Sequence, residues 1–96
     1  MTEIAGKEQN RIGVAAIIIE NTDSAREVNN VLHNFGSLIV GRLGIPYRER
    51  GVSVISVVLD ATPDQISALT GKLGKIKSVT VKAVMSKKSP AKGEKQ

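Results

Sequence analysis

The stretch that decides the fold, residues 11–36, reads RIGVAAIIIENTDSAREVNNVLHNFG. Its first part is apolar at consecutive positions, so both faces of a period-two strand are apolar, which is typical of a central strand covered on both sides. The later part changes to helical spacing, in which a single stripe is apolar. That stripe consists of Ala25, Val28, Leu32 and Phe35, with Val31 beside it. The stretch therefore predicts a strand followed by an amphipathic helix.

Signals at both ends bound this helix. Ser24 followed by Glu27 has the spacing of a capping box, in which each side chain binds a free backbone N–H at the start of a helix. Gly36 suits the position just past a helix end. We therefore expect the helix to begin after Ser24 and to end before Gly36.

The second half of the chain repeats this order. Residues 38–45 form an apolar run with two glycines that ends before Pro46, and proline lacks the N–H that a sheet ladder needs, so a bent edge strand is expected. Tyr47–Gly51, YRERG, is a charged turn. Residues 52–61, VSVISVVLDA, are again apolar on both faces and predict a second central strand.

A second helix and a last strand follow. Thr62 and Pro63 suit the N-cap and first positions of the helix, and Thr62 with Gln65 repeats the capping-box spacing. The buried stripe is expected to comprise Ile66, Leu69, Leu73 and Ile76. Residues 79–86 alternate apolar with more polar side chains, which favours an edge strand.

The predicted order is strand, helix, strand, strand, helix, strand. Right-handed crossovers interlock the two halves into an α+β, ferredoxin-like β-α-β-β-α-β sandwich, a four-stranded antiparallel sheet with two helices on one face. The other face would stay open, and an exposed apolar face is typical of a partner surface. We expect self-association through it, as a homodimer or homotetramer, although the sequence does not decide whether Ile17 or Val57 lies on it.

The two ends of the chain differ from this domain, which we expect to span residues 11–86. Residues 1–10 are polar and lack the apolar stretch of a signal peptide. Residues 87–96 contain four lysines and one glutamate, so they carry +3 of the net charge of +5. Both ends are expected to be disordered because they cannot bury apolar surface. The basic tail either aids solubility or contacts an anionic partner.

Composition excludes several kinds of site. The 96 residues include no cysteine, which removes disulfides, thiolate metal sites and cysteine nucleophiles and fits a reducing cytoplasm. Phe35 and Tyr47 are the only aromatic residues, too few to build a base-stacking surface. No apolar run is long enough to span a membrane. We expect a soluble cytoplasmic protein without a cofactor.

No catalytic or metal-binding set is evident. There is no G-x-S-x-G elbow, and LTGKLGK at residues 69–75 lacks the phosphate-loop spacing. We expect Gly71 there to bring the helix close to the sheet and Gly74 to cap it. His33 is the only histidine, and a transition metal usually takes three or four ligands, so we expect no metal site and no enzyme.

Three stretches carry a resemblance to a known family. They are VNNVLHNFG at Val28–Gly36, GRLGIPYRERGVSVISVVLD at Gly41–Asp60 and ISALTGKLGKIKSVTVK at Ile66–Lys82. In them the chain resembles the family of proposed regulators of the iron-only hydrogenase system, itself similar to ACT domains and to the C-terminal domain of the nickel-responsive repressor. The resemblance implies an ACT-like regulatory domain without catalytic activity. The several histidines and the cysteine with which that repressor domain binds metal are not present here.

Seven residues are candidates for ligand binding or for an interface. ACT-like domains commonly hold effectors at the first loop, where this chain offers donors and acceptors that helix capping would also explain. Arginines of the 41–50 segment can bind a carboxylate or phosphate in forked fashion, or can simply be exposed to water. His33 is either a surface histidine or a ligand contact. The candidates are Asn21, Thr22, Ser24, His33, Arg42, Tyr47 and Arg48.

Two function classes follow. The first is a regulatory domain of a homo-oligomer that senses a small anionic metabolite or assembles with a protein partner. The second is a nucleic-acid-binding regulator that uses the arginine loop and the basic tail. The chain contains no helix-turn-helix outside the sandwich, so transcriptional control in the first class would need a protein partner that carries a DNA-binding domain.

Removal of residues 87–96 separates these classes. The truncated chain is expected to keep the melting temperature of the full chain, because the predicted strands end before the tail. Affinity for duplex DNA, if it arises from the tail, should be weak, fall steeply with salt and vanish on truncation, as measured by fluorescence anisotropy. Tight, sequence-specific binding by the truncated chain would contradict the sensing role.

Overall fold

The computed structural model describes residues 9–87, and its elements follow the predicted order. The expected disorder of residues 1–10 and 87–96 falls largely outside the described residues and stays a prediction. Short 3₁₀ turns η1 (Thr22–Ser24), η2 (Gly36–Leu38) and η3 (Arg48–Arg50) join the main elements. The strands and helices are β1 (Arg11–Ile19), α2 (Ala25–Asn34), β2 (Ile39–Tyr47), β3 (Val52–Ala61), α3 (Pro63–Gly74) and β4 (Val79–Met85).

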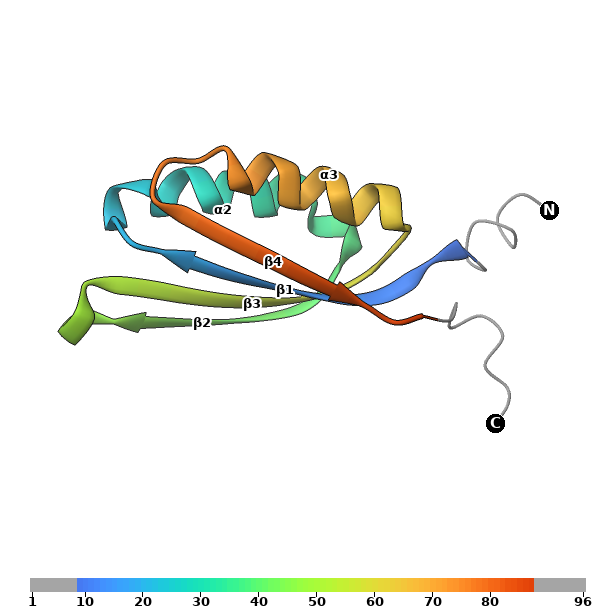
Figure 1. Cartoon of the computed structure of the whole chain (residues 1–96), viewed down its shortest axis with the longest axis horizontal. Coiled ribbons are helices and arrows are strands. Elements are labelled where there is room, and N and C mark those ends of the chain that lie inside the picture. Colours follow the sequence, from blue (N-terminus) through green and yellow to red (C-terminus); the bar gives the residue numbers. More distant parts are fainter. Residues whose placement is uncertain (1–8, 88–96) are drawn as a thin grey trace.

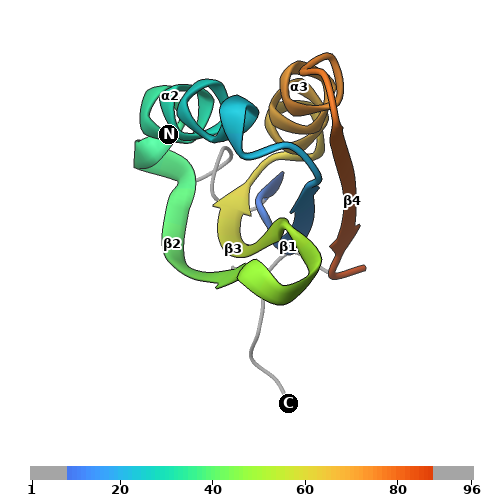
Figure 2. The same cartoon turned by 90° about the vertical axis from the view of Figure 1, so that its left-hand side faces the viewer.

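The four strands form one antiparallel sheet in the order β2-β3-β1-β4, with the two apolar strands in the centre. Figures 1 and 2 show α2 and α3 side by side on the same face of this sheet, with α2 toward the β2 edge and α3 toward the β4 edge. No helix lies on the opposite face in the described part of the chain. The ferredoxin-like βαββαβ sandwich is confirmed.

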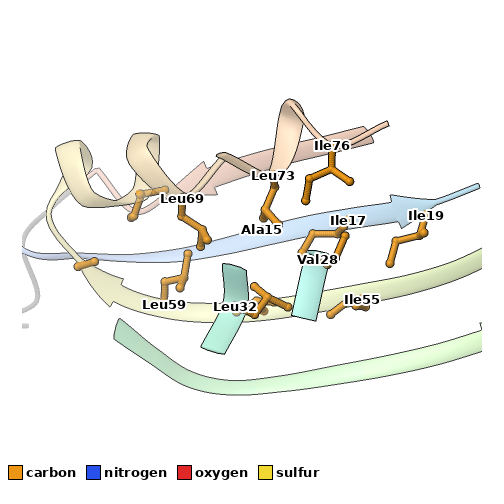
Figure 3. Close-up of a cluster of buried hydrophobic side chains, with 13 residues drawn as sticks. Ala15, Ile17, Ile19, Val28, Leu32, Ile55, Leu59, Leu69, Leu73 and Ile76 are labelled. Atoms are coloured by element: carbon orange, nitrogen blue, oxygen red, sulfur yellow. The ribbon is translucent and has the colours of Figure 1, made fainter. Parts of the chain in front are cut away.

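The core lies between the helices and the sheet, where Figure 3 shows aliphatic side chains of β1, β3, α2 and α3 pointing toward one another. Both predicted helical stripes are confirmed, since their central residues are buried and their flanking residues pack against the core. Ile17 and Val57 are fully buried on this side. Neither of them lies on the open face, so the expectation that one of them does is wrong.

The two predicted capping boxes have different outcomes. At α3, the Thr62 Oγ1 accepts from the Gln65 backbone N–H (3.1 Å) and the Gln65 Oε1 accepts from the Thr62 N–H (3.0 Å), as predicted. At α2, Ser24 makes no side-chain cap, and the predicted box with Glu27 is wrong. The chain there enters α2 through the η1 turn, so Ser24 already has helical backbone angles and its hydroxyl points elsewhere.

The edge strand and the glycines also differ from expectation in detail. β2 does not end before Pro46 but continues through it to Tyr47, because an edge strand tolerates a missing N–H on its unpaired side. A Cβ atom added to Gly71 would have no neighbour within 4 Å, so this glycine does not bring α3 close to the sheet. α3 ends at Gly74, and the cap residue is Lys75.

The close approach of helix and sheet occurs instead at Gly13 in β1. A Cβ atom there would lie 3.0 Å from Ile66 Cδ1 of α3 and 3.2 Å from the Val84 carbonyl oxygen of β4. A side chain at this position would be in tight contact with both elements, and its neighbours would have to shift by a few tenths of an ångström. Gly13 therefore sets the distance at which α3 packs on β1.

Gly13→Val is expected to lower the free energy of unfolding by about 1 to 3 kcal/mol, because the added side chain overpacks the contact with Ile66. Gly71→Ala is the matched control, and it should raise that free energy by about 0.5 to 1 kcal/mol because it replaces an unhindered helical glycine. Urea unfolding followed by circular dichroism measures both. Equal effects of the two changes would refute this packing role.

Candidate functional site

A pocket with a volume of about 270 Å³ lies between α2 and the β2 side of the sheet. Its lining comes from the end of β1, the first turns of α2 and the facing parts of β2 and β3. Most of the lining is apolar. The lining residues are Ile19, Ala25, Asn29, Arg42, Gly44, Ile45, Pro46, Ser53 and Ile55.

Arg42 is the charged residue of this pocket. It pairs with Val57 across β2 and β3, and Val57 faces the helices, so Arg42 extends from the same side of the sheet. Its Nη2 donates to Asn29 Oδ1 of α2 at 2.6 Å. The Asn29 Nδ2 in turn donates to the Ala25 carbonyl oxygen at 3.0 Å. The amide of Asn29 thus links the guanidinium to the helix backbone.

Gly44 supplies space beside Arg42. It pairs with Ile55, and a Cβ atom added to Gly44 would lie 3.9 Å from Ile55 Cγ1, an ordinary contact, with no atom nearer. A side chain here would therefore point into the pocket without a clash. The pocket exists in part because this strand position lacks a side chain.

Polar side chains of the first loop form hydrogen bonds within the chain. Asn21 Oδ1 accepts from the Asp23 N–H at 2.9 Å and so starts the η1 turn, in which Thr22 is the first residue. Ser24 Oγ donates to the Lys77 carbonyl oxygen at 2.7 Å. Next to it, Ser78 has a left-handed φ of 66°, which is unfavourable for a residue with a side chain. Ser24 therefore ties the first loop to the turn before β4.

The remaining candidates lie apart from the pocket. His33 is exposed in the last turn of α2, about 14 Å along the helix axis from Ser24. Tyr47 pairs with Val52 at the end of β2, and Arg48 begins the η3 turn at the tip of the hairpin, which Figure 1 shows beyond the start of α2. The structure thus places Arg42 in the pocket and directs Ser24 to the turn before β4, and it does not bring the seven candidates together.

The open face of the sheet is the second surface of interest. The registers place residues of all four strands in cross-strand rows, and charge enters the three central rows only through Lys82 at the β4 margin. Ile18 and Val54, at the centre, keep 39% and 37% of their surface exposed. The rows are Ile45-Val54-Ile18-Thr80, Leu43-Ser56-Ala16-Lys82 and Gly41-Val58-Val14-Val84.

Residues 9–87 contain neither a cluster suited to a metal ion nor a helix suited to cross a membrane. No group of three or more histidine and acidic side chains is arranged to hold a metal ion there. None of the helices in this range has the length and apolar character needed to cross a membrane.

Sequence reasoning missed Asn29 and Gly44. Asn29 lies one turn after Ala25 beside the apolar stripe of α2, and a polar residue at that boundary is a weak signal for a contact with the sheet. Gly44 lies at a strand position whose neighbours in β3 face the core, so its missing side chain predicts a hole. Neither signal could be read before the register of β2 was known.

The fold is that of a small ACT-like domain. The ACT domain from the GTP pyrophosphokinase of Chlorobium tepidum is 18% identical, covers 78% of this chain and 99% of its own, and superposes with a TM-score of 0.67. The C-terminal domain of the MgtC protein from Mycobacterium tuberculosis is 13% identical, with a TM-score of 0.65 and coverage of 85% and 94%. At these identities the likeness concerns the fold alone.

The chain belongs to the TM1266-like family, described as "Iron-only hydrogenase system regulator, putative", whose profile matches residues 11–83. The solved structure of the uncharacterized protein TM1266 from Thermotoga maritima is 40% identical over 81% of this chain and 99% of that chain, with a TM-score of 0.77. Among curated proteins, none matches the chain. The resemblance stated from the sequence is confirmed at the level of the family and of the ACT-like fold.

Substitutions at Ser24 test whether this residue links the two loops or caps α2. Ser24→Asp keeps a cap acceptor but cannot donate to the Lys77 carbonyl, so it is expected to lower the free energy of unfolding by about 1 kcal/mol. Ser24→Thr keeps the donor and should change it by less. Thermal and urea unfolding measure both. A Ser24→Asp protein as stable as the wild type would favour a capping role.

Proposed function

We propose that this chain is a non-catalytic regulatory protein of an iron-only hydrogenase system that acts as a homo-oligomer and senses a small ligand. Its membership in a family named for regulation and its ACT-like fold support the regulatory role. The observation that carries the homo-oligomer is the open sheet face. In this account, control of transcription requires a protein partner that carries a DNA-binding domain.

The open face has the chemistry of an interface. In β2, β3 and β1 its three central rows are apolar except for Ser56 and contain no charge, and β4 adds Thr80, Lys82 and Val84. Single exposed apolar side chains are ordinary on protein surfaces, but a contiguous apolar face marks an interaction site. Burial of this surface would be favourable by about 25 cal/mol for each Å² of apolar area removed from water.

A second copy of the same chain is the partner that fits this face. Apolar rows need no complementary charge pattern, so the face can pack on itself about a two-fold axis, as isologous interfaces do. Lys82 at the margin can remain at the rim in such a pair, where water still reaches it. A strongly charged partner, such as nucleic acid, would meet few cations on this face.

The nucleic-acid-binding alternative has support from the hairpin tip. Arg48 and Arg50 flank Glu49 in η3, and all three are exposed. Two arginines beside a glutamate form a small basic surface. β4, which leads to the basic tail, ends at the opposite end of the sheet from this tip, and the tail itself lies outside the described residues. The open apolar face therefore supports self-association better than this tip supports nucleic-acid binding.

Val54→Lys is expected to convert the homo-oligomer to a folded monomer. Val54 keeps 37% of its surface exposed in the single chain, so a lysine there can reach water in the monomer but would place a charge in the middle of the interface. Sedimentation velocity at micromolar concentration measures the mass, and circular dichroism verifies the fold.

Ala68→Lys on α3 is the matched control, because it adds the same charge at an exposed position of the helical layer. It should leave the oligomer intact. A wild-type chain that sediments as a monomer would contradict the proposal, and so would a Val54→Lys chain that keeps the wild-type mass.

A further inference from the structure

We propose that the pocket between α2 and β2 binds a small carboxylate with a short aliphatic body, and that Arg42 holds the carboxylate group. The inference rests on the proposed regulatory function and names the chemistry of its effector. Residues of β1, α2, β2 and β3 of a single chain line the site.

The guanidinium of Arg42 is available to a ligand. Among residues 9–87, its one polar contact is the bond from Nη2 to Asn29 Oδ1, and no carboxylate pairs with it. An arginine side chain has five N–H donors in a planar fork, so four of them stay free of partners in this part of the protein. A carboxylate can accept two parallel N–H bonds from such a fork.

Asn29 orients this fork. Its amide nitrogen donates to the Ala25 carbonyl oxygen, and its amide oxygen therefore faces Arg42. Both Ala25 and Asn29 line the pocket, so the bond holds the exposed side chain of Arg42 beside the pocket. Asn29 is a positioning residue for Arg42 in this arrangement.

The walls favour an aliphatic body. Ile19 and Ile55, which are almost fully buried, line the pocket together with Ala25 and Pro46. A phosphate or a sugar would lose hydration against these walls, and Ser53 and Asn29 supply too few polar groups to replace it. An alkyl group gains from the same contact. A carboxylate at Arg42 with an alkyl group toward the isoleucines satisfies both parts of the lining.

The charge and the volume of the pocket restrict the chemical class of the ligand further. No acidic side chain of residues 9–87 lines the pocket, so in this part of the chain the ammonium group of an amino acid would have no counter-charge. The volume of about 270 Å³ lies just below the range of about 300 to 1,000 Å³ that is usual for small-molecule sites. These observations favour a simple short-chain acid over an amino acid or a nucleotide.

Titration of the full-length, ¹⁵N-labelled chain with 3-methylbutanoate tests the site directly. Saturable shifts are expected for the Gly44 and Ser53 amide signals and for the Asn29 side-chain amide signal. The neutral, nearly isosteric 3-methylbutanamide should bind at least tenfold more weakly, because it lacks the charge that Arg42 holds. If the acid and the amide shift these signals with the same Kd, the proposal is overturned.

Three variants complete the test. Arg42→Gln should raise the Kd for 3-methylbutanoate at least tenfold, whereas Arg48→Gln, an exposed arginine outside the pocket, should leave it unchanged. Gly44→Val should abolish the saturable shifts by filling the pocket, and its fold should persist because Gly44 has room for a Cβ. An unchanged Kd in Arg42→Gln or in Gly44→Val overturns the proposal, as does the absence of saturation in the wild type.

Sedimentation of the wild-type chain in the same samples reports the homo-oligomer independently. If 3-methylbutanoate fails to bind while the chain still sediments as an oligomer, the carboxylate site is wrong and the proposed assembly stands. If it binds to a chain that sediments as a monomer, the site stands and the proposed assembly is wrong.

Discussion

The packing of both helices against one face of β1 and β3 is the contact on which the rest of the structure depends. These two strands are apolar on both faces, yet the helices of residues 9–87 cover only one of them. Gly13 lets α3 come within contact distance of β1, and the stripes of α2 and α3 complete the core. The position of the pocket and of the open face follows from which side of the sheet the helices cover.

Two surfaces arise from this arrangement, and β2 belongs to both. On the helix side, Arg42 and Gly44 face the pocket, while Leu43 belongs to the open face and Ile45, which pairs with Val54 there, also borders the pocket. Alternate residues of one edge strand therefore contact a ligand and a second copy of the chain in our account. A ligand that binds one conformation of β2 more tightly than another would change the affinity of the chains for one another, since coupling between two sites is reciprocal.

The sequence was sufficient for the fold because period-two and helical patterns are local and strong here. It could not separate the two faces of the central strands, since Ile17 and Ile18 are equally apolar and only the helices decide which is buried. The cap at Thr62 was predictable because proline follows it, whereas the η1 turn redirected Ser24 to Lys77. The partnership of Arg42 with Asn29 joins a helix to a strand, so it depends on a register that composition does not reveal.

Solvent paramagnetic relaxation of methyl groups in the wild-type chain tests the central claim, that the open face is an interface between copies. A soluble paramagnetic probe should relax the exposed Ala68 methyl of α3 strongly at micromolar protein concentration. The Ile18 and Val54 methyls should be protected, although each side chain is more than a third exposed in the single chain. If the Ile18 and Val54 methyls relax as fast as that of Ala68, the open face is free in solution and the account is contradicted.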